Sequence, residues 1–82
     1  MAAGTMILDV RETDEWNAGH IDGALNRPLG TLPATILALD RNTPVALHCE
    51  GGTRSAIGAA LLEQMGFSDV TDLTGGWNEW KA

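Results

Sequence analysis

The sequence predicts an α/β fold with a short parallel sheet. Three brief apolar runs, at residues 6–10, 45–47 and 70–73, have the length and composition of strands buried on both faces. Segments with helical spacing separate these runs, and parallel strands need crossover helices of this kind. The chain of 82 residues is long enough for one small domain, which we expect to span residues 1–82.

The first strand, residues 6–10, is followed by a short helix. Thr13 can cap this helix, and two acidic residues stand in its first turn, where the helix dipole favours them. Gly19 is suited to end the helix. Residues 21–28 are expected to be irregular, because glycine and proline interrupt them.

Two further helices are predicted in the rest of the chain. Residues 31–39 carry apolar side chains at i, i+4 and i+7, and Pro33 stands in the first turn, where its missing N–H costs little. A longer helix is expected over residues 54–65, after the strand at 45–47. Its buried face should hold three apolar side chains spaced by four residues, namely Ile57, Leu61 and Met65.

Charge and composition exclude several classes of function. Eleven acidic residues against five Lys and Arg give a formal net charge of −6, which disfavours nucleic acids and membrane surfaces as partners. No apolar run is long enough to cross a bilayer, and no secretory leader is expected. A single cysteine excludes an internal disulfide, so the cytoplasm is the expected compartment. No ligand spacing indicates a metal, and no glycine fingerprint indicates a phosphate cofactor.

The one cysteine, Cys49, stands where a site is expected, between the end of a strand and the start of a helix. Gly51 and Gly52 allow the backbone to curl inward, so that amide N–H groups converge on one point. The helix dipole and Arg54 also favour a thiolate, the nucleophilic form of cysteine. The alternative is a buried structural cysteine beside a turn, and we favour the activated nucleophile.

Three segments in the same order resemble the rhodanese-like (sulfurtransferase) domains. Residues 8–24 contain L-D-V-R-E, then E-W, then G-H-I-D-G-A, similar to the D-V-R, E-[W/Y] and G-H-I-x-G-A signature of that family. Residues 49–55 read C-E-G-G-T-R-S, which resembles its active-site loop. Residues 73–80 contain L-T-G-G-W and a second tryptophan, which resembles its closing motif. The resemblance therefore covers nearly the whole chain.

The resemblance implies a small three-layer sandwich with about four parallel strands and a sulfurtransferase activity. Cys49 would take a sulfane sulfur from a donor and become a cysteine persulfide. A thiophilic acceptor, cyanide or a thiol, would then remove this sulfur in a ping-pong reaction. The cradle of the terminal sulfur would consist of Glu50, Gly51, Gly52, Thr53 and Arg54.

Two other classes of function stay open. The first is a Cys-based phosphatase or arsenate reductase. The active-site loop of those enzymes looks like His-Cys followed by five residues and Arg, whereas four residues separate Cys49 from Arg54 here. A non-catalytic rhodanese-like binding or regulatory module is the other alternative, and the intact cysteine, glycines and arginine speak against it.

Glu50 bears on the choice of sulfur donor. By resemblance, the thiosulfate-using members of the family carry a more basic active-site loop than this one. An acidic residue in the loop should repel a dianionic donor. The C-x-G-G-x-R-S form is similar to rhodanese domains fused to metallo-β-lactamase-fold persulfide dioxygenases. The donor is therefore expected to be thiosulfate or, by this argument, a thiol persulfide such as glutathione persulfide.

Several other polar residues are expected to be mainly structural. Asp9 and Arg11 can support the loop, with Arg11 paired to Glu12 or Glu15, although a plain ion pair is the favoured interpretation. Ser55 is expected to cap the helix. Two histidines, His20 and His48, are expected to be structural rather than catalytic, and Trp77 is expected to line the site.

The resemblance also indicates which part of the family fold is missing. These domains begin with a strand and a helix before the D-V-R strand, so an N-terminal edge strand is expected to be absent here. The open edge of the sheet offers a place for a partner domain or a protein sulfur acceptor. The expected partners are thus a small-molecule donor and acceptor, and a protein of this kind.

Overall fold

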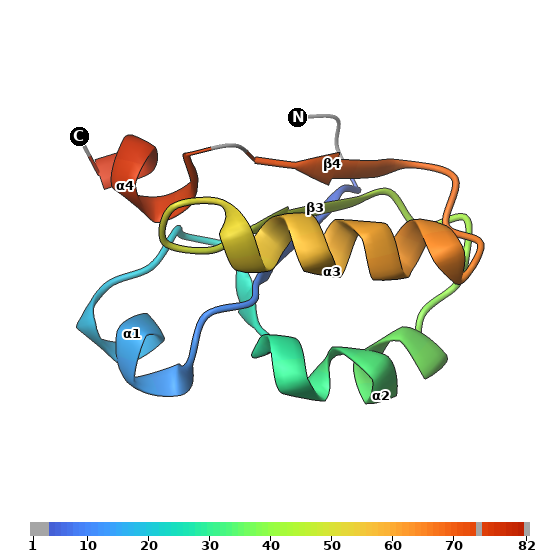
Figure 1. Ribbon diagram of the computed structural model, residues 1–82, viewed down its shortest axis with the longest axis horizontal. Helices are drawn as coiled ribbons and strands as arrows, with labels where there is room; N and C mark the ends of the chain where they lie inside the picture. Colours follow the sequence, from blue (N-terminus) through green and yellow to red (C-terminus); the bar gives the residue numbers. More distant parts are fainter. Residues whose placement is uncertain (1–3, 74, 82) are drawn as a thin grey trace.

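The computed structural model describes residues 4–73 and 75–81 and contains a four-stranded sheet flanked by helices (Figure 1). All neighbouring strands are parallel, and their order is β2-β1-β3-β4. The predicted α/β fold with about four parallel strands is therefore confirmed. The strands are β1 (Met6–Asp9), β2 (Leu25–Asn26), β3 (Val45–His48) and β4 (Val70–Asp72).

The three predicted helices agree with the structure except at their ends, and a further helix forms after residue 75, where no helix was predicted. The helix predicted over residues 31–39 starts in a 3₁₀ turn that precedes the α-helix. The last two residues of the predicted range, 38 and 39, lie beyond the end of the α-helix. The elements are α1 (Thr13–Ala18), η1 (Leu29–Thr31), α2 (Leu32–Leu37), α3 (Thr53–Gln64) and α4 (Gly76–Lys81).

Two local predictions in the N-terminal half were wrong. The N-cap of α1 is Glu12 and not Thr13, because the Glu15 side chain accepts a hydrogen bond from the Glu12 amide at 3.0 Å and fixes the helix start there. The segment expected to be irregular contains β2, which pairs with β1 through two residues only. A strand this short carries no periodic pattern that a sequence can show.

The buried face of α3 also differs from the prediction. Ile57 and Met65 are 56% and 41% exposed. The face that contacts the sheet is instead formed by three small residues and Leu62, and a Cβ added to Gly58 would lie only 3.0 Å from the Leu47 side chain. The helix and the sheet therefore lie so close together that this position requires a small residue. The buried residues of α3 are Ser55, Gly58, Ala59 and Leu62.

The topology brings the loop after β3 to one end of the molecule. The strands are parallel, so their carboxyl ends share one edge of the sheet, and α1, the start of α3 and α4 gather there (Figure 1). The hydrophobic core lies between the sheet and helices α2 and α3 and supports this edge. Among the described residues, no helix is long and apolar enough to span a membrane.

Candidate active site

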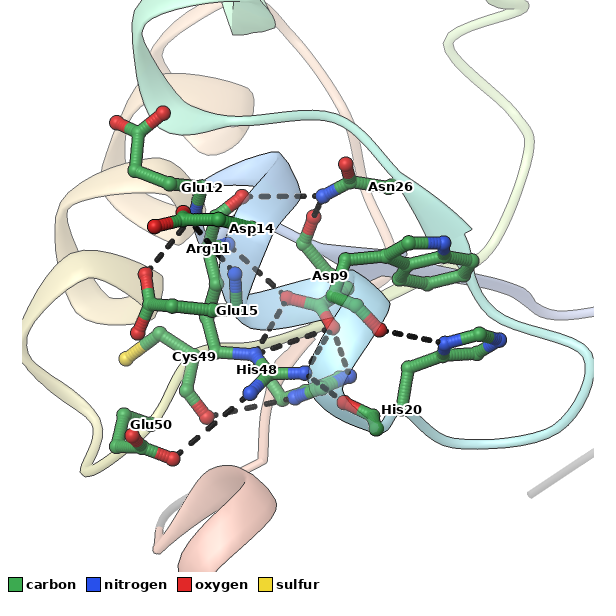
Figure 2. Close-up of polar contacts among 12 residues, drawn as sticks. Asp9, Arg11, Glu12, Asp14, Glu15, His20, Asn26, His48, Cys49 and Glu50 are labelled. Atoms are coloured by element: carbon green, nitrogen blue, oxygen red, sulfur yellow. Dashed lines mark hydrogen bonds and ion pairs between the residues drawn. The ribbon is translucent and has the colours of Figure 1, made fainter.

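The loop after β3 folds around the sulfur of Cys49. Cys49 is 1% exposed, and its Sγ accepts a hydrogen bond from the Gly52 amide at 3.0 Å. Gly52 has a φ of 113°, in the left-handed region where glycine is favoured, and this turn brings its amide back to the sulfur. The sulfur points away from the polar cluster of Asp9 and Arg11 (Figure 2). The loop therefore forms a small cradle of amide donors around one atom.

The environment of Cys49 lowers the pKa of its thiol. Burial raises this pKa, but hydrogen bonds from the Ser55 side chain and from the amides of Ser55, Gly52 and Arg54 lower it and prevail. A thiolate is stabilised here by donors that the fold holds in place. These are the conditions that a cysteine nucleophile requires.

Helix α4 holds the outer side of the loop. The Trp77 amide donates to the Cys49 carbonyl at 2.8 Å, and the Asn78 amide donates to the Glu50 carbonyl at 3.1 Å. Gly76 has a φ of 50°, and any Cβ there would collide with the Cys49 carbonyl oxygen. The glycine pair of the closing motif thus lets the chain pass directly over the Cys49 loop. This role of the two glycines was not predicted, since only Trp77 of the motif was expected to line the site.

Arg54 does not stand free beside the sulfur. Its two terminal nitrogens donate to the carboxylate of Glu15 on α1 at 2.6 and 3.0 Å. The bond from Arg54 lowers the pKa of Glu15 to about 2. The same bond, more than the nearby Cys49, raises the pKa of Arg54. No local pattern in the sequence indicates this ion pair, because 39 residues separate the two side chains.

Asp9 and Arg11 form a buried ion pair below the loop (Figure 2). Their exposed fractions are 0% and 2%, and Arg11 donates to Asp9 from Nε at 3.0 Å and from a terminal nitrogen at 2.8 Å. Pairing of Arg11 with Glu12 or Glu15 was therefore a wrong prediction. Arg11 also donates to the Gly19 carbonyl at 2.7 Å and lies 3.8 Å from Glu50, so the pair reaches the loop through Glu50.

The two histidines and Trp77 occupy supporting positions. His48 is fully buried, and this burial lowers its pKa and favours the neutral imidazole. His20 stacks on Trp16 at a ring distance of 3.5 Å and lies outside the loop. Trp77 covers Arg11, with the guanidinium 5.3 Å from the ring centre.

The remaining residues of the predicted cradle lie in the loop itself, and Ser55 lies behind the loop. Gly51 and Thr53 are exposed, and Glu50 is partly exposed. Ser55 does not cap α3, because Gly52 occupies that position. Its hydroxyl instead lies 2.7 Å from Asp72 Oδ1 and 3.6 Å from Cys49 Sγ. Asp72 was not predicted as a site residue, and its only signal in the sequence was its place near the end of a predicted strand.

A cysteine held by backbone amides at the carboxyl edge of a parallel sheet defines a class of proteins with a cysteine nucleophile. The chain belongs to the rhodanese-like domain family, because the sequence model of that family matches residues 1–82. It is 37% identical over 79 residues to the thiosulfate sulfurtransferase GlpE of Stutzerimonas stutzeri, covering 96% of this chain and 72% of that protein. It is 36% identical over 74 residues to the Bacillus subtilis protein YqhL, covering 90% of this chain but 59% of that relative.

Solved structures agree with this assignment. The rhodanese-like domain of the Alr3790 protein from Anabaena sp. superposes with a TM-score of 0.86 at 32% identity, covering 94% of this chain and 90% of that one. A rhodanese-like domain protein from Staphylococcus aureus gives a TM-score of 0.88 at 32% identity, covering 96% and 76%. The fold and the order of the motifs are thus those of the family.

Proposed function

We propose that the chain is a sulfurtransferase that carries a sulfane sulfur on Cys49. The observation that carries this proposal is the amide cradle, in which the Gly52 N–H lies 3.0 Å from a sulfur whose pKa is lowered. The relatives named as thiosulfate sulfurtransferases support the same reaction class. We further propose that one domain over residues 1–82 performs both half-reactions.

The reaction consists of two displacements at sulfur. The Cys49 thiolate attacks the sulfane sulfur of the donor, a new S–S bond forms, and the donor's own bond to that sulfur breaks to release an anion. An acceptor nucleophile then attacks the terminal sulfur of the persulfide, and the Cys49 thiolate leaves. Amides of residues 50–54 stabilise the negative charge in both forms, and neither step needs a cofactor.

The charges around the loop favour a thiol persulfide over thiosulfate as the donor. Glu15 neutralises Arg54, and Glu50 stands next to the nucleophile with 44% of its side chain exposed. A dianionic donor therefore meets little net positive charge, whereas a persulfide carries less charge at its reacting end. Since Cys49 is the one cysteine, an external thiol must take up the sulfur.

The ion pair of Arg54 also separates this reaction from phosphate chemistry. A Cys-based phosphatase uses an arginine as a bidentate clamp for the oxyanion. Here both terminal nitrogens of that arginine already donate to Glu15. Cys49 is also nearly buried, which suits a slim sulfane sulfur approaching end-on better than a tetrahedral oxyanion.

The test is intact mass after incubation with glutathione persulfide or with thiosulfate. We expect the wild-type chain to gain one sulfur, to lose it again to cyanide, and to load faster from glutathione persulfide. Cys49→Ser is the matched control and should gain none. Glu50→Gln should improve loading from thiosulfate by about threefold, since it removes one repulsive charge.

The outcomes separate the alternatives. A folded wild-type chain that gains sulfur from neither donor would contradict the proposal and leave a binding module. Equal loading from both donors, unchanged in Glu50→Gln, would leave the carrier reaction in place but contradict the preference for a thiol persulfide.

A further inference from the structure

The hydroxyl of Ser55 lies among three groups that compete for its single proton. Its Oγ is 2.7 Å from Asp72 Oδ1, 3.2 Å from the Gly52 carbonyl and 3.6 Å from Cys49 Sγ. An ionised carboxylate and a carbonyl oxygen can only accept hydrogen bonds. The hydroxyl can therefore serve one acceptor at a time.

The geometry decides in favour of Asp72. An O–H donating to a carboxylate is a short and strong hydrogen bond, and 2.7 Å lies at the usual length for O–H donors. The contact to sulfur is 0.9 Å longer, and in it the thiol of Cys49 is suited to donate to the Ser55 oxygen. A Ser55 hydroxyl that donates to the sulfur lowers the pKa of the Cys49 thiol, and Asp72 weakens this stabilisation of the thiolate because it accepts the same proton at a shorter distance.

We propose that Asp72 is a positioning residue that turns the Ser55 hydroxyl proton away from Cys49 and so holds back ionisation of the resting thiol. The amide of Gly52 still stabilises the thiolate, so that Asp72 sets how far ionisation proceeds and does not prevent it. Asp72 is suited to this role because it ends β4, whose partner β3 leads directly into Cys49.

The consequence for catalysis rests on the proposed function. In the persulfide, the negative charge lies on the terminal sulfur, and Sγ becomes a neutral atom bonded to carbon and sulfur. A hydroxyl turned toward Asp72 then costs nothing, whereas it disfavours the free thiolate. Asp72 therefore favours the sulfur-loaded form over the unloaded anion.

Other charged groups act on Cys49 from the elements around it. Arg54 on α3 favours the anion but is paired with Glu15 on α1, burial favours the neutral imidazole of His48 on β3, and Glu50 opposes the anion from the loop. These groups affect the ionisation of the Cys49 thiol equally in wild type and in the variants. A comparison between variants therefore isolates the effect of Asp72.

The experiment is the pH profile of Cys49 alkylation by iodoacetamide, which needs no sulfur donor and is therefore independent of the proposed function. We expect Asp72→Asn to alkylate about tenfold faster than wild type on the acidic side of the profile, which corresponds to a midpoint about one pH unit lower. Asp69→Asn, an exposed carboxylate just before β4, is the matched control and should leave the profile unchanged.

Ser55→Ala tests whether the effect passes through the hydroxyl. Alone it should shift the profile by less than about twofold in rate, and it should abolish most of the effect of Asp72→Asn in the double variant. The proposal is overturned if Asp72→Asn leaves the midpoint in place or raises it. It is also overturned if the full shift persists without Ser55, since direct charge repulsion would then explain it. Asp72→Ser replaces Asp72→Asn should the latter fail to fold.

Discussion

Two arginine–carboxylate pairs flank the Cys49 loop, and they differ in burial. The Asp9–Arg11 pair is 0% and 2% exposed, and its partners are two residues apart in the chain. The Glu15–Arg54 pair is 28% and 32% exposed, and it joins α1 to α3 across 39 residues. Both contacts join a guanidinium to a carboxylate, but they differ in how far water reaches them.

The difference shows how burial divides their roles. A buried pair is costly to break, because the remaining charge has neither a partner nor water, so it fixes the frame under the loop. A partly exposed pair contributes little stability, because water screens it, but it sets which charges a substrate meets. The first pair is thus a structural element, and the second adjusts the electrostatics of the site.

The largest effect is expected from breaking the buried pair. Arg11→Ala removes the guanidinium from the buried Asp9 carboxylate, which keeps only the amide of residue 11 at 3.0 Å and His48 at 3.6 Å, and should lower the free energy of unfolding by about 3–5 kcal/mol. Urea denaturation followed by circular dichroism measures this. Arg27→Ala, an exposed arginine two residues before η1, is the control and should change it by less than about 0.5 kcal/mol. A loss below about 1 kcal/mol for Arg11→Ala would contradict the distinction between the pairs.

A smaller effect is expected where α4 crosses the loop. Gly76→Ala forces a Cβ against the Cys49 carbonyl and should cost about 2 kcal/mol of stability and slow sulfur loading at least about tenfold. Gly30→Ala is the matched control, because no heavy atom lies within 4 Å of its added Cβ. Thermal melts and the loading assay report the two quantities, and equal behaviour of both variants would refute the close approach.

The smallest effect is expected from the exposed pair and depends on pH. The folded state lowers the pKa of Glu15 from 4.5 to about 2, so its contribution is present above pH 4.5 and is lost as the pH falls toward 2. Glu15→Gln should therefore destabilise by about 1 kcal/mol at pH 7 and by almost nothing near pH 2. Urea midpoints across this range measure it, with Glu63→Gln on the exposed face of α3 as control. A difference that does not depend on pH would argue against the ion pair.

The parts of this molecule that sequence could predict are those set by local pattern. The runs at β1, β3 and β4 and the glycine turn after Cys49 carry their signals within a few residues. The missed features depend on contacts between distant segments, as in the Glu15–Arg54 pair. No local pattern encodes which of several carboxylates an arginine will meet.

The same limit explains the error at α3. Apolar spacing indicated Ile57 and Met65, but Gly58 sits against the sheet because a helix with small residues can pack closer than one with large ones. The position of Asp72 beside Ser55 arises in the same way, from the pairing of β4 with β3. The sequence thus predicted Cys49 and its loop as a candidate site, and only the fold could show what surrounds them.

The hold of α4 on the Cys49 loop has a consequence for how the protein responds to heat. A short helix with mostly exposed residues, such as α4, opens at lower free energy than the central strands of a sheet, in fluctuations that leave the rest of the fold intact. Opening of α4 would release the carbonyls of Cys49 and Glu50, and the loop would lose its outer restraint. Thermal inactivation should therefore precede melting of the sheet, with amide exchange at Trp77 and Asn78 faster than exchange in β3.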